Sequence, residues 1–169
     1  SLIYSKYNER KGECEEALKQ IRNTKSEIRN LADADMIWLD ILNDATLKKR
    51  ARHVISENLR VKEAVKVLRM NNLSTFGRLM NASHASLKND YQVTGIELDT
   101  LAETAQQIKG CLGARMTGAG FGGCVIAIVH KDSLEELKDK VSKKYFSATA
   151  NDCEIYETEI DDGVRETEP

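Results

Sequence analysis

Apolar residues recur every three or four positions through most of the first 110 residues of the chain. This spacing predicts α-helices, because a helical turn takes 3.6 residues and so gathers these side chains on one face. We expect helices over about residues 6–21, 45–70, 74–88 and 94–110, a loop over 23–31, and a short helical segment over 36–42. The longest stripe, on the predicted helix 45–70, consists of Leu47, Ala51, Val54, Val61, Val65 and Leu68.

The ends of the predicted helices carry residues that can satisfy free backbone groups. Asp44 is a suitable N-cap for the helix 45–70. The segments Thr94–Glu97 and Ser133–Glu136 both fit the capping-box pattern, the second one before a helix over 133–147. Gly110 fits a C-cap position, where glycine adopts a left-handed conformation at little cost.

An apolar run from Cys124 to Val129 predicts a buried strand, and residues 153–160 carry a weaker strand pattern. We therefore expect an α+β fold, with a helical layer from residues 6–109 on one face of a small mixed or antiparallel sheet. The helix 133–147 would cross between the two strands, in the right-handed sense if they are parallel. The polar residues 161–169 are expected to fray, and 169 residues suit a single domain over 1–169.

Five glycines lie within eleven residues, at positions 113, 118, 120, 122 and 123. Such a cluster is typical where the backbone takes positive φ angles or where bare backbone must come close to another group. Exposed backbone N–H groups in such a loop can bind an anion such as phosphate. The dinucleotide-binding fingerprint does not apply, because it needs a strand before the glycines and a helix after them. Two interpretations stay open, a phosphate-binding loop and a loop that lets a helix pack closely on a sheet.

Composition excludes several classes of protein. The chain is 41% hydrophobic and 31% charged with a net charge of −2, which suits a globular protein and gives no reason to expect nucleic acid or membrane as a partner. The four cysteines, Cys14, Cys111, Cys124 and Cys153, have no metal-binding or disulfide-framework spacing. We expect a reduced, cytoplasmic protein without a metal site of its own, and Cys124 as a small buried apolar residue.

Other candidate residues are better explained by packing. Trp38, the only tryptophan, is expected to belong to the core. His53 is interpreted as a solvated or hydrogen-bonded structural histidine. Ser83 and His84 are neighbours, but adjacent residues on a helix do not face each other, so a serine-hydrolase pair is rejected. We expect the segment 83–91 to shape the wall of a cleft.

The segment Arg115-Met-Thr-Gly-Ala-Gly-Phe-Gly-Gly-Cys124 resembles the third signature of galactokinases. These enzymes belong to a superfamily that also contains homoserine, mevalonate and phosphomevalonate kinases. Further segments that resemble galactokinases follow in the same order, namely Ser5–Arg10, Cys14–Leu18, Arg50–Val54, Ser83–Tyr91 and Glu97–Asp99. The resemblance covers most of the chain.

This resemblance implies the C-terminal lobe of a kinase that transfers the γ-phosphoryl group of ATP to the anomeric hydroxyl of galactose. The N-terminal lobe, which would hold most of the ATP and Mg²⁺ contacts and the catalytic base and arginine, would be absent, and the fragment alone inactive. Tyr7 would contact the sugar. The resemblance implies an active-site glycine loop made of Met116, Thr117, Gly118, Ala119, Gly120, Phe121, Gly122 and Gly123. A monomer is favoured for the parent enzyme.

Three alternatives remain. The first is a kinase for a related sugar such as N-acetylgalactosamine or arabinose. The second is a regulatory protein that senses galactose without turnover and acts through a protein partner. The third is a structural half-domain without activity of its own.

Overall fold

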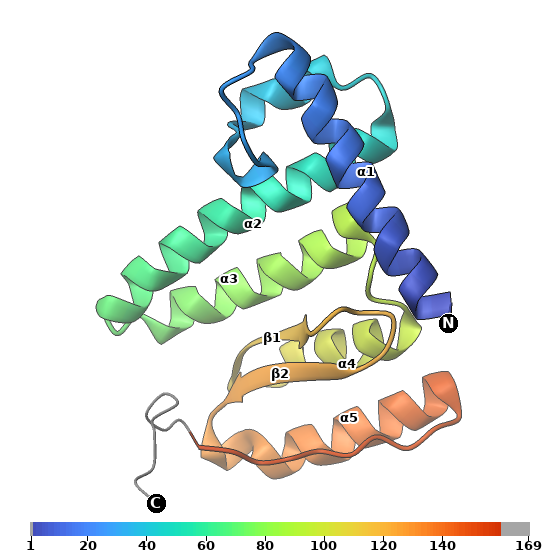
Figure 1. Ribbon diagram of the computed structural model, residues 1–169. Coiled ribbons are helices and arrows are strands. Elements are labelled where there is room, and N and C mark those ends of the chain that lie inside the picture. The colour runs from blue at the N-terminus through green and yellow to red at the C-terminus, as the bar shows by residue number, and fades with distance from the viewer. Residues whose placement is uncertain (1, 160–169) are drawn as a thin grey trace, which may run out of the picture.

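The helical spacing of the first 110 residues produces a series of helices in the computed structural model, which describes residues 2–159 (Figure 1). The α-helices of this part are α1 (Leu2–Thr24), α2 (Ala45–Arg69), α3 (Leu73–Ser86) and α4 (Ile96–Gln106). Shorter turns join them, the 3₁₀ turns η1 (Leu31–Asp33) and η2 (Met36–Ile41) and the π-helical turn η3 (Leu87–Tyr91). The strands β1 (Cys111–Thr117) and β2 (Cys124–Val129), the turn η4 (Lys131–Ser133) and α5 (Leu134–Thr149) follow.

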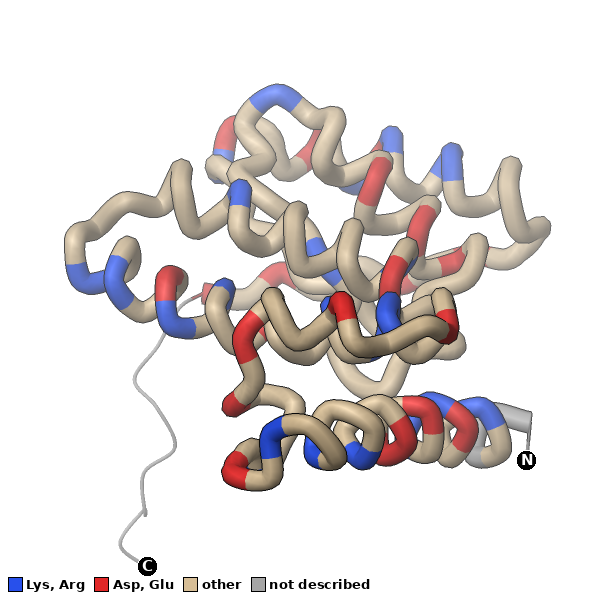
Figure 2. The backbone as a smooth tube through the Cα atoms, turned by 90° about the horizontal axis from the view of Figure 1, so that it is seen from above, with Lys and Arg blue, Asp and Glu red and all other residues tan. Residues whose placement is uncertain are grey.

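The buried side chains form separate groups. One lies where α1 and α2 meet η1 and η2, with Trp38 packed against it as predicted. Another lies between α4, α5 and the strands, and consists of Ala105, Ile108, Ala114, Leu137 and Val141. Acidic and basic residues are interspersed along the helices (Figure 2). No helix within residues 2–159 has both the length and the apolar character needed to cross a membrane.

β1 and β2 form an antiparallel hairpin that pairs Cys111 with Val129 at one end and Thr117 with Cys124 at the other. This confirms an α+β fold with a small antiparallel sheet. β1 itself was not predicted, because Gly113 and Arg115 interrupt its apolar pattern. Of the predicted helical layer, α3 and α4 contact the hairpin, whereas α1 and α2 pack on each other.

The outer edge of β1 is bonded by helix side chains instead of by another strand. The Ala114 N–H donates to Asn81 Oδ1 at 2.9 Å, and the Met116 N–H donates to His84 Nδ1 at 3.2 Å. Gln106 Nε2 donates to the Ala114 carbonyl at 2.8 Å. Positions 81 and 84 lie one helical turn apart, so α3 can serve two alternate residues of the strand. The buried backbone groups of β1 are therefore satisfied on both edges.

α3 lies against β1 (Figure 1), and it can come this close because glycine faces glycine where the two cross. A Cβ atom on Gly77 would lie 1.9 Å from the Leu112 carbonyl oxygen, and a Cβ on Gly113 would lie 2.2 Å from the Gly77 carbonyl oxygen. Both distances are far below van der Waals contact. The close-packing interpretation of the glycines thus holds at Gly113.

β2 is not the buried strand that the sequence predicted. Val125 and Val129 pack against the group of side chains shared with α4 and α5, but Cys124 is exposed and Ile126 is 50% exposed. The prediction of a buried Cys124 was wrong, because helices cover one face of this two-stranded sheet and no described element covers the alternate positions of β2.

The predicted strand 153–160 is absent over residues 153–159, and residue 160 and the tail 161–169 lie outside the described residues. Cys153 and Ile155 pack on the core beside α5, and Glu154 and Tyr156 are exposed, which is the alternation of a strand. The segment runs back along α5 (Figure 1), but it pairs with no strand of the described chain. The predicted crossover inside one sheet is therefore not formed.

The helix ends agree with the sequence only in part. The Asp44 carboxylate accepts from the N–H groups of Thr46 and Leu47, as expected for an N-cap. The capping boxes were wrong. α4 begins after Gly95 (φ 90°) without a side-chain cap, and α5 continues directly from the turn η4 at Ser133. Gly110 is not a C-cap, because α4 ends at Gln106 and Gly110 packs against Ser133 instead.

The apolar stripe of α2 is buried only in its first half. Ala51 lies in the core and Leu47 and Val54 pack against it, while Val61, Val65 and Leu68 are exposed. The elements η1 and η2 pack on α2 where its first half is buried, and α3 also packs on α2 but leaves these three residues exposed.

Candidate functional site

The glycine loop joins β1 to β2 over residues 118–123. Met116 and Thr117 belong to strand β1 rather than to the loop, with Met116 buried and Thr117 exposed, which corrects the predicted loop boundary. Positive φ angles occur at Gly118 (85°), Gly120 (81°), Gly122 (115°) and Gly123 (103°), and also at Phe121 (59°). Glycine suits the first four positions because L side chains are strained at such angles, and Phe121 adopts the left-handed conformation in spite of its side chain.

The tip of the loop is fixed to the segment before α4. The Phe121 N–H donates to the Val93 carbonyl at 2.7 Å. A Cβ atom on Gly120 would lie 2.2 Å from the same carbonyl oxygen. The missing side chain at Gly120 therefore lets the loop pack against Val93. No described atom lies within 4 Å of a Cβ built on Gly118 or Gly122. Open backbone that another molecule could approach is therefore found at Gly118 and Gly122.

The N-terminal end of α1, which carries Tyr7, contacts this loop through another residue. The preceding residue, Lys6, holds its ammonium 5.5 Å from the centroid of the Phe121 ring, a cation–π contact between α1 and the loop. Tyr7 itself is 52% exposed and lines a cavity of about 270 Å³ together with Cys14, Tyr91 and other residues. No residue of the loop 118–123 lines this cavity. The N-terminal end of α1 and the loop 118–123 nevertheless lie at the same end of the molecule (Figure 1).

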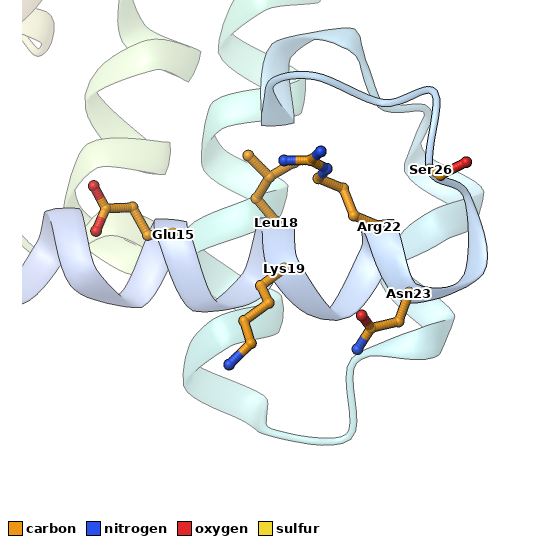
Figure 3. A pocket seen from close by; sticks show the side chains of 6 residues that line it. All are labelled: Glu15, Leu18, Lys19, Arg22, Asn23 and Ser26. Carbon is orange, nitrogen blue, oxygen red and sulfur yellow. The ribbon is translucent and has the colours of Figure 1, made fainter.

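A second hollow lies away from the glycine loop. It has a volume of about 370 Å³ and lies along the C-terminal half of α1 (Figure 3). Its lining residues are Glu15, Leu18, Lys19, Arg22, Asn23 and Ser26, several of them exposed. No buried polar group converges there, so we assign it no function.

A buried arginine holds the segment that leads to Val93. Arg50 on α2 is 2% exposed, and its guanidinium donates to the Asp90 carbonyl at 2.5 Å and to Gln92 Oε1 at 2.9 Å. These contacts fix the end of η3 and Gln92, whose φ of 58° turns the chain toward Val93. Single π-helical turns are rare and frequently occur at functional sites.

Arg10 supports the same segment from α1. Its Nε donates to the Tyr91 carbonyl at 2.8 Å. Glu13 accepts from Arg50 Nε at 2.6 Å and from Arg10 Nη1 at 3.0 Å, so one carboxylate lies between both guanidinium groups. Buried charges of this kind must be paired and hydrogen-bonded to be tolerated. Sequence reasoning missed this network, although Arg50 lies on the apolar face of α2 between Leu47 and Ala51, which was an available signal.

His53 is a hydrogen-bonded structural histidine. Its Nδ1 lies 2.9 Å from Ser86 Oγ, and its ring stacks on Tyr91 with 4.5 Å between the centroids. Burial lowers the pKa of His53 to about 4. The ring therefore stays neutral in the folded protein and contributes to packing beneath η3.

The lowered pKa of His53 predicts a loss of stability at mildly acidic pH. Between pH 6.5 and 4 the unfolded chain binds a proton that the folded chain does not, so the free energy of unfolding falls as the pH falls. Going from pH 6.5 to 5 should cost about 2 kcal/mol, at 1.36 kcal/mol per pH unit. Urea unfolding at both pH values measures this difference.

The variant His53→Gln should show a smaller pH dependence, and the exposed His130→Gln should match the unchanged protein. Part of the dependence should remain, because burial also lowers the pKa of His84. If the free energy of unfolding falls equally with pH in His53→Gln and in the unchanged protein, the lowered pKa of His53 is contradicted.

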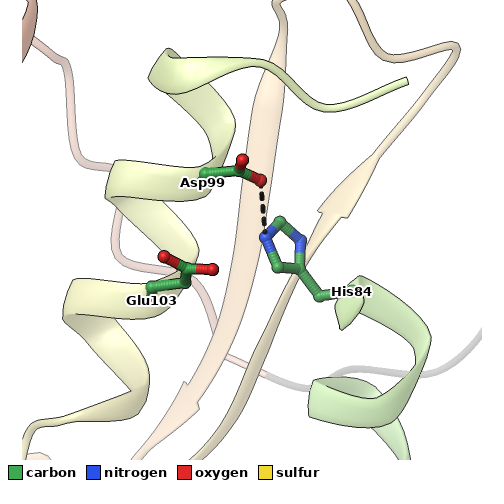
Figure 4. Close-up of side chains that lie close together, drawn as sticks. All are labelled: His84, Asp99 and Glu103. Carbon is green, nitrogen blue, oxygen red and sulfur yellow. Dashed lines mark ion pairs between the residues drawn. The ribbon is translucent and has the colours of Figure 1, made fainter. Parts of the chain in front are cut away.

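Ser83 and His84 have separate partners. Ser83 Oγ donates to Glu57 Oε1 at 2.6 Å, whereas His84 bonds to β1, so they form no nucleophile–base pair. His84 also lies near Asp99 and Glu103, three side chains that could in principle gather a cation (Figure 4). The Lys88 ammonium lies 3.4 Å from Asp99 Oδ2 and 2.5 Å from Glu103 Oε1 and already offsets part of the negative charge of these carboxylates.

Comparisons with family models, curated proteins and solved structures agree. A family model described as "GHMP kinases C terminal" matches residues 56–147. Galactokinase from Staphylococcus saprophyticus is 52% identical over 169 residues, covering 98% of this chain and 44% of that protein. Galactokinase from Lactiplantibacillus plantarum is 53% identical, covering 98% of this chain and 43% of that protein.

Among solved structures, Lactococcus lactis galactokinase complexed with galactose matches with a TM-score of 0.84 and 50% identity. The match covers 88% of this chain and 39% of that one. The chain therefore spans less than half the length of the curated relatives and of the solved structure that it matches.

Proposed function

Because the chain belongs to the family of C-terminal domains of the GHMP kinases (galactokinase, homoserine, mevalonate and phosphomevalonate kinases), we propose that it is one lobe of a galactokinase. The complete enzyme would transfer the γ-phosphoryl group of ATP to the anomeric hydroxyl of galactose. This chain, as a single domain over 1–169, would be its C-terminal lobe.

The observation that carries this proposal is the contact between the N-terminal end of α1, which carries Tyr7, and the glycine loop. Lys6 contacts Phe121, the open backbone of Gly118 and Gly122 lies in the same loop, and the Arg10–Arg50 network supports the segment behind it. The relatives that match nearly the whole chain at about half identity are galactokinases. The galactose-complexed neighbour supports a sugar as the substrate.

Each part of this site has a chemical role in the proposal. The Tyr7 hydroxyl would donate a hydrogen bond to a sugar oxygen or accept one from a sugar hydroxyl. The loop would let backbone approach the transferring phosphoryl group, with N–H groups facing its anionic oxygens. Phosphoryl transfer depends mainly on positioning and on stabilising charge, so a fixed loop suits the task.

The loop fits a phosphate better than a metal ion. Residues 118–123 contain no carboxylate, which Mg²⁺ prefers as a ligand, but they do offer backbone N–H groups at glycines. Magnesium, the adenosine part of ATP and the catalytic base would then be held by the rest of the longer protein. The parent enzyme is proposed to act as a monomer.

The test compares this chain with a protein of the full length of its relatives. With ATP, Mg²⁺ and galactose, the long protein should form galactose 1-phosphate and this chain alone should form none. In the long protein, Tyr7→Phe should raise the KM for galactose by about tenfold, the effect of one lost hydrogen bond of about 1.4 kcal/mol. The exposed Tyr156→Phe is the matched control and should change nothing.

Turnover by this chain alone would contradict the lobe assignment. A long protein that binds galactose without phosphorylating it would favour the sensor, and turnover on another sugar alone would favour the related kinase.

A further inference from the structure

His84 is buried between three elements. It lies on α3 with 2% exposure, and its two ring nitrogens face β1 on one side and α4 on the other (Figure 4). Nδ1 accepts the Met116 N–H at 3.2 Å, and Nε2 lies 3.3 Å from Asp99 Oδ1. The sequence singled out His84 only as a neighbour of Ser83.

The contact with Met116 determines the protonation state of the ring. A backbone N–H can only donate, so Nδ1 must carry a lone pair and no proton. A neutral histidine then carries its proton on Nε2. Asp99 Oδ1, 3.3 Å from Nε2, is the acceptor nearest to that proton. Both atoms are buried and, as placed, neither has a hydrogen-bond partner among the described residues, so a bond between them would satisfy both. An imidazolium would instead place an N–H against the Met116 N–H.

The charged groups around the ring are consistent with a neutral histidine. Asp99 and Glu103 face it from α4, and Lys88 faces it from η3. Lys88 offsets the two carboxylates, which reduces their pull on a second ring proton. Burial is the largest effect, and it lowers the pKa of His84.

We propose that His84 and Asp99 are positioning residues for the glycine loop. Asp99 fixes the tautomer of His84, and His84 fixes the backbone of β1 at Met116, two residues before Gly118. Together with the Phe121–Val93 bond, this contact holds the loop at its entrance and at its tip. The effect on catalysis rests on the proposed galactokinase function, whereas the tautomer and the backbone anchor do not.

The anchor can be tested on this chain by nuclear magnetic resonance. With ¹⁵N-labelled histidine at pH 8, His84 should show a protonated Nε2 and an unprotonated Nδ1, and this state should persist to lower pH than in an exposed histidine. The Met116 amide should exchange slowly with solvent, and His84→Ala should speed its exchange by about tenfold or more, as expected when a local bond is lost.

Two conservative variants separate the roles. In His84→Asn the short amide oxygen can replace Nδ1 as acceptor, so Met116 protection should largely return. In Asp99→Asn the amide can donate to Nε2 and drive the proton to Nδ1, so the tautomer should shift and Met116 protection should fall. Glu103→Gln, which changes a charge nearby without bonding to His84, should leave both signals unchanged.

A protonated Nδ1 in the unchanged protein, or a ring that gains a second proton near pH 6.5, would overturn the proposal even if every variant failed to fold.

In the long protein, Asp99→Asn should lower the kcat for galactose phosphorylation by about tenfold to a hundredfold, as a displaced loop predicts. Glu103→Gln should keep the normal kcat. If the long protein shows the expected His84 tautomer but no kinase activity, only the proposed function is refuted. If the long protein is active and Asp99→Asn leaves its kcat unchanged, only the positioning role is refuted.

Discussion

Gly77→Ala is expected to prevent the chain from folding stably. The new Cβ would lie 1.9 Å from the Leu112 carbonyl oxygen and 2.3 Å from its carbon, so α3 would have to move off β1. That movement would also stretch the bonds from Asn81 and His84 to the strand. Overpacking costs about 1–3 kcal/mol, and each buried backbone group left unsatisfied costs about 1–3 kcal/mol more.

The total, on the order of 5 kcal/mol, approaches the whole stability of many domains, about 5–15 kcal/mol. Circular dichroism during urea unfolding should therefore show no cooperative transition, or one at much lower urea. Gly12→Ala is the matched control, because its Cβ meets nothing within 4 Å on the exposed side of α1. It should stabilise the chain by about 0.5–1 kcal/mol through helix propensity. A Gly77→Ala variant as stable as the unchanged protein would show that the backbone contact is not as close as described.

Gly118→Val in the long protein is expected to reduce kcat/KM by on the order of 10²-fold, the range for disturbed catalytic positioning. From the sequence alone Gly120 would be an equally good position for this test, since bare backbone there could also mean a nearby substrate. In the structure Val93 occupies that space, whereas the side of Gly118 is open. A side chain at Gly118 would project to where the transferring group is proposed to lie. Its only cost to the stability of the fold would be the strain of a side chain at a positive φ.

Melting temperature and steady-state kinetics of two variants separate the interpretations. Gly118→Val should lose activity with a modest change in melting temperature, and Gly120→Ala should lose stability by clashing with Val93. A Gly118→Val protein with unchanged kcat/KM would remove this part of the loop from the active site.

Local signals in the sequence accounted for most of the helices. The spacing in 45–70 gave α2 to within one residue, and Asp44 caps it as expected. β1 was missed because its stability comes from Asn81, His84 and Gln106 rather than from its own apolar pattern. No local rule reports which distant side chains bond to a strand edge.

The site was predictable where it depends on residue identity and not where it depends on distant contacts. The glycine motif and Tyr7 could be found by resemblance, and the structure brings them together through Lys6 and Phe121. Arg10 and Tyr91 are 81 positions apart, so their contact could not be seen in any sequence window. The prediction that β2 is buried failed for a related reason. An apolar run shows that a strand favours burial, but it does not show which element would cover the strand.

The two edges of the hairpin differ in a way that limits self-association. The outer edge of β1 is closed by side chains of α3 and α4, while no described residue bonds to the outer edge of β2. Unpaired strand edges are templates on which further chains can add. Two copies joined at β2 would form a sheet whose outermost strands are both β1, and neither could accept another copy. Edge-to-edge growth of this domain would therefore stop at a pair instead of extending into a fibre.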